Sequence, residues 1–448
     1  MRSWLSRHRL PLAAFAIALI VYCAVAGDRL RRRSTDPHFV VQANAWLHGK
    51  MDIERWPGGA DDPAKIEEVR LDDGLIVRGR RLSTRQTFRV AGGEEIPIAR
   101  VAETLRTLHY NSFPPFPSVL MIPQVLIHGE WANDVGTTVV LAALVPALLL
   151  VLLARLRAAG LSTRTQREDL WLAALLAFGC VFFFTAVQGR VWFTAHVVGV
   201  LLAILFVWAS VEARRPALAG LFLGLAFATR TPMLFMAPLF LWELWRGDPR
   251  LRLGRFIRFA APAVAIGLVC AWYNFARFHE WTEFGHSYLA VRQQAQIERY
   301  GLFDLHYFGR NLAVALTLLP ELRPQPPYLS ISGHGLALWL TTPALLLLLW
   351  PRIRGRWHVP VLGTALAVAA WSLAYQNSGW VQFGYRFSLD YMVLLVVLLA
   401  IGGRPFDRFT KALIVVGIVV NLFGAITFHR FNGFYRMDNP TYDCVVPH

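Results

Sequence analysis

The most regular feature of this sequence is a series of long apolar runs that follow one another closely from residue 133 onward. A helix needs roughly 20 apolar residues to cross a bilayer, so runs of this kind predict membrane-spanning helices. With a further apolar run near the N-terminus, the pattern predicts an all-α polytopic membrane protein with about eleven transmembrane helices. They are expected at residues 10–26, 133–154, 170–188, 191–211, 216–229, 232–245, 256–275, 334–350, 358–375, 384–401 and 412–428.

Two polar stretches interrupt this apolar pattern and set the expected domain limits. The expected order is a first transmembrane helix (1–27), a first extracytoplasmic loop with interfacial helices (28–132), a transmembrane bundle (133–275), a second extracytoplasmic loop (276–333), C-terminal transmembrane helices (334–428) and an extracytoplasmic tail (429–448). The N-terminal run also has the layout of a signal peptide, but it is longer than the usual core of about 7–15 residues. An uncleaved first span is therefore favoured.

The first polar stretch is expected to hold a short helix and a β-hairpin. Residues 36–47 predict a helix with an apolar stripe that lies along the membrane interface, with Thr35 or Asp36 as its cap and Pro37 in its first turn. Residues 69–77 predict a hairpin whose turn is Asp72-Asp73-Gly74, because Asp-Gly accepts the positive φ of such turns. Residues 84–90 suggest a further strand.

Composition and charge place the protein in a membrane with its N-terminus in the cytoplasm. Hydrophobic residues make up 55% of the 448 residues, and the formal net charge is +16. Arginines gather in alternate gaps between the apolar runs, and loops of this kind face the cytoplasm. One basic cluster, Arg29 and Arg31 to Arg33, is expected on the outer side and opposes this orientation. The other basic gaps support it. The chain has no soluble basic module with interleaved aromatic residues, so we expect no nucleic-acid partner.

Several short motifs resemble those of the C-type (GT-C) membrane glycosyltransferase superfamily, in particular the bacterial relatives of protein mannosyltransferases and lipid A aminoarabinose transferases. The motifs occur in the family's order and cover most of the chain. They are Thr35-Asp36-Pro37-His38-Phe39, 49–53, 110–117, 219–224, 229–232, Tyr273-Asn274, Phe284-Gly285 and 383–387.

This resemblance implies an inverting transfer of a sugar from a polyprenyl-phosphate donor to an extracytoplasmic lipid, glycan or protein. It implies Asp36 as the catalytic base, since the attacking hydroxyl must lose its proton. Arginines at the outer ends of spans suit the phosphate of the leaving group. The expected substrate-binding residues are Arg230, Arg386, Arg190, His38 and Tyr110. The resemblance also implies the cytoplasmic (inner) membrane of a bacterial cell, with the active site outside the cytoplasm.

The candidate residues also have structural interpretations. An aspartate before a proline is a preferred helix cap, so Asp36 has an ordinary reason to stand there. An arginine at the end of a span can extend to lipid headgroups. Family members often have a second acidic residue where this chain has Pro37. We therefore expect no metal and no cofactor, and the chain could also be a degenerate, non-catalytic family member.

A polytopic transporter or lipid flippase is the alternative from another functional class. Transporters often show internal repeats and place charges near the middle of the membrane, whereas the charges here lie at the outer boundary. The sequence leaves the sugar, the acceptor, the lipid carrier and the oligomeric state open.

Overall fold

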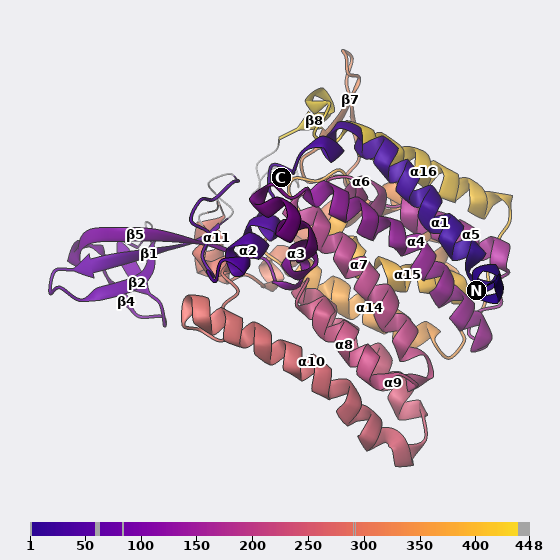
Figure 1. Cartoon of the computed structure of the whole chain (residues 1–448). Helices are drawn as coiled ribbons and strands as arrows, with labels where there is room; N and C mark the ends of the chain where they lie inside the picture. Colours follow the sequence, from indigo (N-terminus) through magenta and orange to yellow (C-terminus); the bar gives the residue numbers. More distant parts are fainter. Residues whose placement is uncertain (1, 59–62, 83–84, 290, 292, 438–448) are drawn as a thin grey trace.

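The computed structural model describes residues 2–58, 63–82, 85–289, 291 and 293–437, and it shows a helical bundle from which a small β-sheet projects (Figure 1). The bundle helices are α1 (Arg2–Ala26), α4 (Asp134–Ala158), α5 (Gln166–Phe178), α6 (Phe182–Ala186), α7 (Val191–Ser210), α8 (Pro216–Phe227), α9 (Ala237–Arg246), α10 (Pro249–Phe278), α13 (Leu338–Thr341), α14 (His358–Leu373), α15 (Leu389–Ile401) and α16 (Arg408–Thr427). The prediction of a mostly helical chain is confirmed.

Fewer helices than expected are long enough to cross a bilayer. Within the described part of the chain, five helical stretches have the required length and apolar composition. They are Arg9–Arg31, Asp134–Ala158, Val191–Ala213, Pro249–Phe278 and Arg408–Thr427. Helices α8 and α14 are apolar but shorter. The predicted count of about eleven spans is therefore not confirmed.

Two predicted spans are broken into shorter pieces. In the region 334–350, α13 ends at Thr341, and a 3₁₀ helix, Pro343–Leu349, follows it. Pro343 has no N–H to continue the helical hydrogen bonds, and the side chain of Asn421 in α16 donates to the carbonyl of Thr341 (2.6 Å). The region 170–188 divides into α5 and α6 near Gly179. A hydrophobicity window detects the apolar content of such regions but not these breaks.

Helix α7 lies at the centre of the bundle, and its apolar residues face neighbours on all sides. In its most apolar window 83% of the residues are buried, against 17% in α1 and α10. A helix that is apolar all round belongs inside a bundle, whereas α1 and α10 show much of their apolar surface at its edge. Trp192 and Phe193, the second and third residues of α7, line the large cavity described below.

The projecting sheet has five antiparallel strands in the order β4-β3-β2-β1-β5 (Figure 1). These strands are β1 (Pro63–Leu71), β2 (Ile76–Leu82), β3 (Thr87–Val90), β4 (Glu95–Pro97) and β5 (Val101–Asn111). The predicted hairpin is confirmed, since Arg70 pairs with Ile76 and Gly74 has a φ of +84° at the turn. Strand β5 pairs along the whole of β1 and was not predicted from the sequence.

The two polar segments, 28–132 and 276–333, meet at one end of the bundle. Their helices are α2 (His38–Leu47), α3 (Phe116–His128), α11 (Gln294–Tyr300) and α12 (Phe308–Leu316). Two short strands of the second segment, β6 (Glu321–Leu322) and β7 (Leu329–Ser332), form a sheet with β8 (Tyr435–Arg436). Ala64 of β1 bridges to Leu289, and both segments pack around Phe278 at the end of α10.

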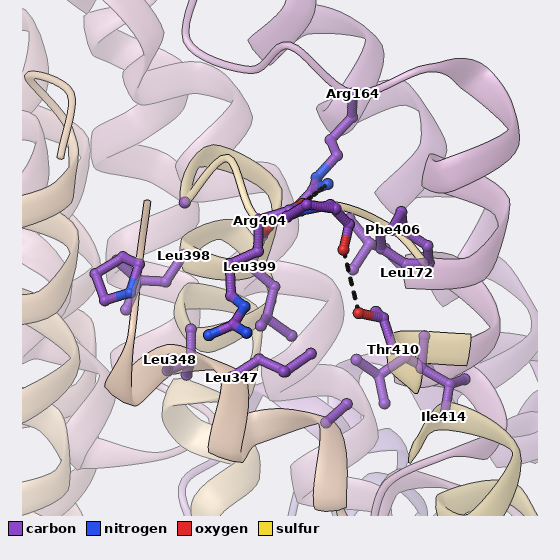
Figure 2. A pocket seen from close by; sticks show the side chains of 15 residues that line it. Arg164, Leu172, Leu347, Leu348, Leu398, Leu399, Arg404, Phe406, Thr410 and Ile414 are labelled. Atoms are coloured by element: carbon purple, nitrogen blue, oxygen red, sulfur yellow. Dashed lines mark hydrogen bonds between the residues drawn. The ribbon is translucent and has the colours of Figure 1, made fainter. Parts of the chain in front are cut away.

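A small cavity of about 20 Å³ lies at the other end of α15 (Figure 2). Its volume is about that of one water molecule. Arg164 covers it by donating hydrogen bonds to the carbonyl oxygens of Leu399 (2.9 Å) and Arg404. Leucines from α5 and α15 form much of its wall. This arrangement ties the loop after α4 to the loop after α15, and we assign it a structural role.

Candidate functional site

A cavity of about 870 Å³ lies where the two polar segments cover one end of the helical bundle. The first segment contributes Asp36 and the loop before α3, and the second contributes the stretch after α10. The wall is rich in aromatic rings and contains three arginines. Its lining includes Asp36, Phe113, Arg190, Trp192, Phe227, Arg230, Glu283, His286, Phe303, Trp371, Tyr375, Trp380, Arg386, Phe387 and His429. Four of the residues predicted from the sequence, Asp36, Arg190, Arg230 and Arg386, are therefore brought together.

Asp36 is held at the cavity wall by contacts of its backbone and of one carboxylate oxygen. Its Oδ2 accepts hydrogen bonds from Arg190 Nε (2.5 Å) and Thr35 Oγ1 (2.6 Å). Its carbonyl accepts from the N–H of Val191 at the start of α7 (3.1 Å). Asp134, the first residue of α4, accepts from both the N–H and the hydroxyl of Ser34. The segment that carries Asp36 is thus attached to two bundle helices.

The expectation that Thr35 or Asp36 caps the following helix is wrong. Helix α2 begins at His38, Pro37 is its N-terminal flanking residue, and no side chain caps it. Pro37 has a non-helical backbone, and its carbonyl accepts from the N–H groups of Val40 and Val41. The carboxylate of Asp36 is then free of the backbone donors of α2 and pairs with Arg190 instead. Helix capping therefore does not explain why an aspartate occupies position 36.

The three arginines of the cavity have different partners. Arg190 binds Asp36 and also lies 2.7 Å from Nε2 of His429. Arg230 forms a two-pronged ion pair with Asp390, with 2.8 Å between Nη2 and Oδ2. Arg386 is 4% exposed and donates through Nη1 to the carbonyl oxygens of Gly379 and Val381. Within the described residues its Nε has no hydrogen-bond partner, and no carboxylate pairs with it.

Asp390, the second residue of α15, is not among the residues predicted from the sequence. It is buried, and His196 of α7 (3.3 Å) and Ser372 of α14 (3.4 Å) lie within reach of its carboxylate beside Arg230. A signal was present, because an ionisable residue inside an apolar run is expensive and is usually paired or functional. The run 389–401 contains this single acid.

Breaking the buried pair of Arg230 and Asp390 is expected to destabilise the protein. Arg230→Gln leaves an unpaired carboxylate inside the bundle, which costs about 3–5 kcal/mol of the free energy of unfolding. The double variant Arg230→Met/Asp390→Leu removes both charges and is expected to recover much of that loss. Denaturant unfolding in detergent measures both. The pair of the exposed Arg214 with the half-buried Glu212 supplies the control, since Arg214→Gln should change stability by less than about 1 kcal/mol. Equal losses in the single and double variants would contradict the prediction.

His38 and Tyr110 lie outside the described lining of the cavity. His38 is fully buried beside Asp36, with its ring 6.0 Å from Phe113 and 6.1 Å from Trp192, and both of these rings do line the cavity. Tyr110, near the end of β5, packs edge-on against Phe278 (5.5 Å between ring centres) in the core between sheet and bundle. The position of Tyr110 therefore does not support its predicted contact with the substrate. His38 is separated from the cavity only by the rings of Phe113 and Trp192.

Acid is expected to unfold the protein partly through His38. Burial lowers the pKa of His38 from 6.5 to about 4. Between these values the unfolded chain binds the proton more tightly, so stability is lost as the pH falls from about 6.5 toward about 4. Thermal unfolding across this window should show a flatter pH profile in His38→Phe than in the wild type. The exposed His48 serves as the control, and His48→Phe should keep the wild-type profile. Identical profiles for wild type and His38→Phe would refute this account.

Comparisons with known proteins do not assign the chain to a family. A scan of protein-family models finds no match, and a search of curated proteins finds none. A search of solved structures gives the crystal structure of the Archaeoglobus fulgidus oligosaccharyltransferase in its apo form, at 12% sequence identity and a TM-score of 0.46. That likeness covers 93% of this chain and 56% of the archaeal enzyme, so the chain spans about half of the enzyme's length. Because a TM-score below 0.5 leaves the family open, the proposals below rest on this chain's own residues.

Proposed function

We propose that this protein is a membrane glycosyltransferase that moves a sugar from a polyprenyl-phosphate donor to a hydroxyl group of a lipid, glycan or protein outside the cytoplasm. The observation that carries the proposal is that the carboxylate of Asp36 lies on the wall of one cavity together with Arg190, Arg230 and Arg386. Its volume of about 870 Å³ falls in the range of about 300–1,000 Å³ common for ligand pockets. Aromatic walls suit the apolar faces of a sugar ring and the first units of a polyprenyl chain.

The proposed reaction uses Asp36 as the general base. The acceptor oxygen forms a bond to the anomeric carbon while the bond from that carbon to the phosphate oxygen breaks. The electron pair leaves with the polyprenyl phosphate, and the proton of the acceptor hydroxyl passes to the carboxylate of Asp36. Attack from the face opposite the phosphate inverts the anomeric configuration. Asp36 suits this role because Arg190 and Thr35 share one of its oxygens, Oδ2, and leave Oδ1 for proton transfer.

In this proposal the three arginines of the cavity have different roles. Arg386 is the main phosphate ligand, because its guanidinium is buried at the cavity wall and its charge has no carboxylate partner within the described residues. A lipid phosphate would supply the missing negative charge and strong hydrogen-bond acceptors. Arg230 is already neutralised by Asp390, so it contributes less charge and mainly stabilises the cavity wall. Arg190 orients Asp36.

The position of these charges favours an enzyme over a transporter or lipid flippase. Asp390 is the second residue of α15, and Arg230 directly precedes the 3₁₀ helix Thr231–Met236, so this ion pair lies at helix ends that border the cavity. Carriers commonly place ionisable groups near the middle of the bilayer, between repeated halves. A site at one end of the bundle suits an enzyme that meets its lipid substrate at the membrane surface.

The proposal is tested by sugar transfer in membranes. Membranes that contain the protein are incubated with polyprenyl-phosphate donors that carry different labelled sugars, and label in lipid, glycan and protein fractions is measured. Transfer above that of membranes without the protein is the expected result for at least one donor. If a broad panel of donors gives no such transfer while the protein is inserted and folded, the proposed activity is wrong. The bacterial inner membrane is the proposed location.

A further inference from the structure

A histidine of the second polar segment, His286, lines the large cavity and has no role in the reaction described above. The residue is half-buried. Within the described residues no hydrogen bond reaches the imidazole, and neither ring nitrogen is among the unpaired atoms that are closed off from solvent. The side chain therefore offers its hydrogen-bonding atoms to a molecule that occupies the cavity.

The backbone on both sides of His286 is held by one carboxylate. Oε1 of Glu283 accepts hydrogen bonds from the N–H groups of Gly285 (2.5 Å) and Ser287 (3.5 Å), and Oε2 accepts from the hydroxyl of Ser287. Gly285 has a φ of +97°, and a β-carbon there would lie 2.8 Å from the ring of Phe278 at the end of α10. His286 thus begins a short 3₁₀ helix that is packed closely against the bundle.

The surroundings of the imidazole suit a neutral hydrogen-bonding partner. Two rings of the cavity wall, Phe113 and Tyr375, pack edge-on against it, with 6.4 Å and 6.3 Å between ring centres. Burial, together with the charges of Arg277 and Arg230, lowers the pKa of His286 from 6.5 to about 4. At pH 7 the ring is therefore neutral, with one nitrogen as a donor and the other as an acceptor. This pair matches hydroxyl groups, which both donate and accept, better than a phosphate, which only accepts.

On one side, contacts between rings connect His286 to the proposed phosphate ligand. Tyr375, which packs against His286, also packs against Phe387, with 6.0 Å between ring centres. The guanidinium carbon of Arg386 lies 5.3 Å from the centre of the Phe387 ring, and that of Arg230 lies 5.2 Å from it. The sugar of a donor is bonded directly to its phosphate, so a phosphate at Arg386 brings the sugar to this wall.

On the other side, a second series of contacts leads from His286 toward the proposed base. Phe113 packs against Trp192, with 6.5 Å between ring centres. The guanidinium carbon of Arg190, the partner of Asp36, lies 5.6 Å from the centre of the Trp192 ring. His286 thus belongs to a wall of rings that joins the arginine side of the cavity to the carboxylate side. The transferred sugar must reach from one side to the other, because its anomeric carbon receives the acceptor oxygen while it loses the phosphate.

We propose that His286 binds hydroxyl groups of the sugar carried by the donor and thereby helps to select that sugar. This inference rests on the proposed glycosyl transfer and adds a residue that recognises the sugar itself. The N–H of the imidazole donates to one sugar oxygen, and the other ring nitrogen accepts from a hydroxyl group. The neighbouring rings of Phe113 and Tyr375 pack on the apolar faces of the sugar. No bond forms or breaks at the imidazole, so it contributes to affinity and specificity.

Binding of donors with and without a sugar tests this inference in the absence of any acceptor. Thermal stabilisation of the purified full-length protein is measured with undecaprenyl phosphate and with undecaprenyl phosphate that carries glucose, galactose, mannose or N-acetylglucosamine. In His286→Phe the affinity for the preferred glycosylated donor should fall roughly tenfold, as expected when one or two neutral hydrogen bonds are lost. Its affinity for undecaprenyl phosphate itself should stay at the wild-type value, which also shows that the variant is folded. His286→Gln keeps a donor and an acceptor and should recover part of the loss. His48→Phe, at an exposed histidine, is the matched control.

Deoxy forms of the preferred sugar provide a second and more specific measurement. In the wild type, removal of the hydroxyl group that contacts His286 should weaken binding about as much as His286→Phe does. In His286→Phe the same deoxy donor should bind as the parent donor does, because the partner of that hydroxyl is already missing. A loss that is equal in the wild type and in His286→Phe for every deoxy donor would overturn the inference.

The other outcomes separate this inference from the proposed function. If His286→Phe binds every glycosylated donor as His48→Phe does, His286 does not recognise the sugar, whereas the glycosyltransferase proposal stands as long as transfer occurs. If His286→Phe weakens undecaprenyl phosphate as strongly as the glycosylated donors, the residue belongs to the phosphate site, and the inference is overturned. It is overturned as well if no sugar of the panel adds affinity in the wild type. Loss of the sugar-dependent affinity without any measurable transfer would support the sugar site and count against the proposed reaction only.

Discussion

Asp36→Asn is expected to reduce sugar transfer by about a hundredfold to ten-thousandfold, the usual contribution of a general base. The amide keeps the size of the side chain and a hydrogen-bond acceptor for Arg190 and Thr35, but it cannot take the proton of the acceptor hydroxyl. Because no side chain caps α2, the substitution removes no cap, and the helix should form as in the wild type. Transfer from a labelled polyprenyl-phosphate donor in membranes measures the effect.

Asp28 offers a matched control for this experiment. It lies eight residues earlier and also binds an arginine, Arg430 (2.8 Å), but its side chain is 67% exposed and it does not line the cavity. Asp28→Asn should therefore transfer sugar at nearly the wild-type rate. Undiminished transfer by inserted Asp36→Asn protein would show that the carboxylate is not the base. Asp36→Asn should also bind undecaprenyl phosphate as the wild type does, because Arg386 is the proposed phosphate ligand.

Arg386→Gln is expected to weaken the binding of a lipid phosphate by about tenfold to a hundredfold, the range for hydrogen bonds to charged groups. The guanidinium is buried at the cavity wall, and within the described residues its Nε has no hydrogen-bond partner and no carboxylate forms an ion pair with it. Thermal stabilisation of the purified protein by undecaprenyl phosphate measures this binding without any acceptor. Transfer should fall with it, and a higher donor concentration should restore part of the rate.

The stability of Arg386→Gln distinguishes a ligand-binding arginine from a structural one. Removal of a buried charge without a partner should leave the free energy of unfolding unchanged or higher, whereas Arg230→Gln is expected to lower it. Arg386→Lys keeps the charge but not the planar fork, so it should recover part of the phosphate binding. Arg299→Gln, at an exposed arginine of the second polar segment, is the control. Normal stabilisation by undecaprenyl phosphate in Arg386→Gln would remove this residue from the phosphate site.

Local sequence patterns predicted much of the architecture. Apolar runs indicated the membrane class and the positions of the helical segments, and the Asp-Gly turn indicated the hairpin between β1 and β2. Each of these signals is carried by neighbouring residues, because helix and strand periods repeat over a few positions. The sequence could not predict β5 as the partner of β1, since that pairing depends on residues far apart in the chain, such as Lys65 and His109.

The sequence by itself determined that this is a helical membrane protein with charged residues at the ends of its helices, and it singled out Asp36 and three arginines. Only the tertiary structure decided which charges neutralise each other. The pairs of Asp36 with Arg190 and of Arg230 with Asp390 join residues 154 and 160 positions apart. Such pairs depend on how the helices pack, which no local pattern encodes. Packing therefore decided that, among the described residues, Asp36 caps no helix and its side-chain hydrogen bonds use Oδ2, and that Arg386 has no carboxylate partner within 4 Å.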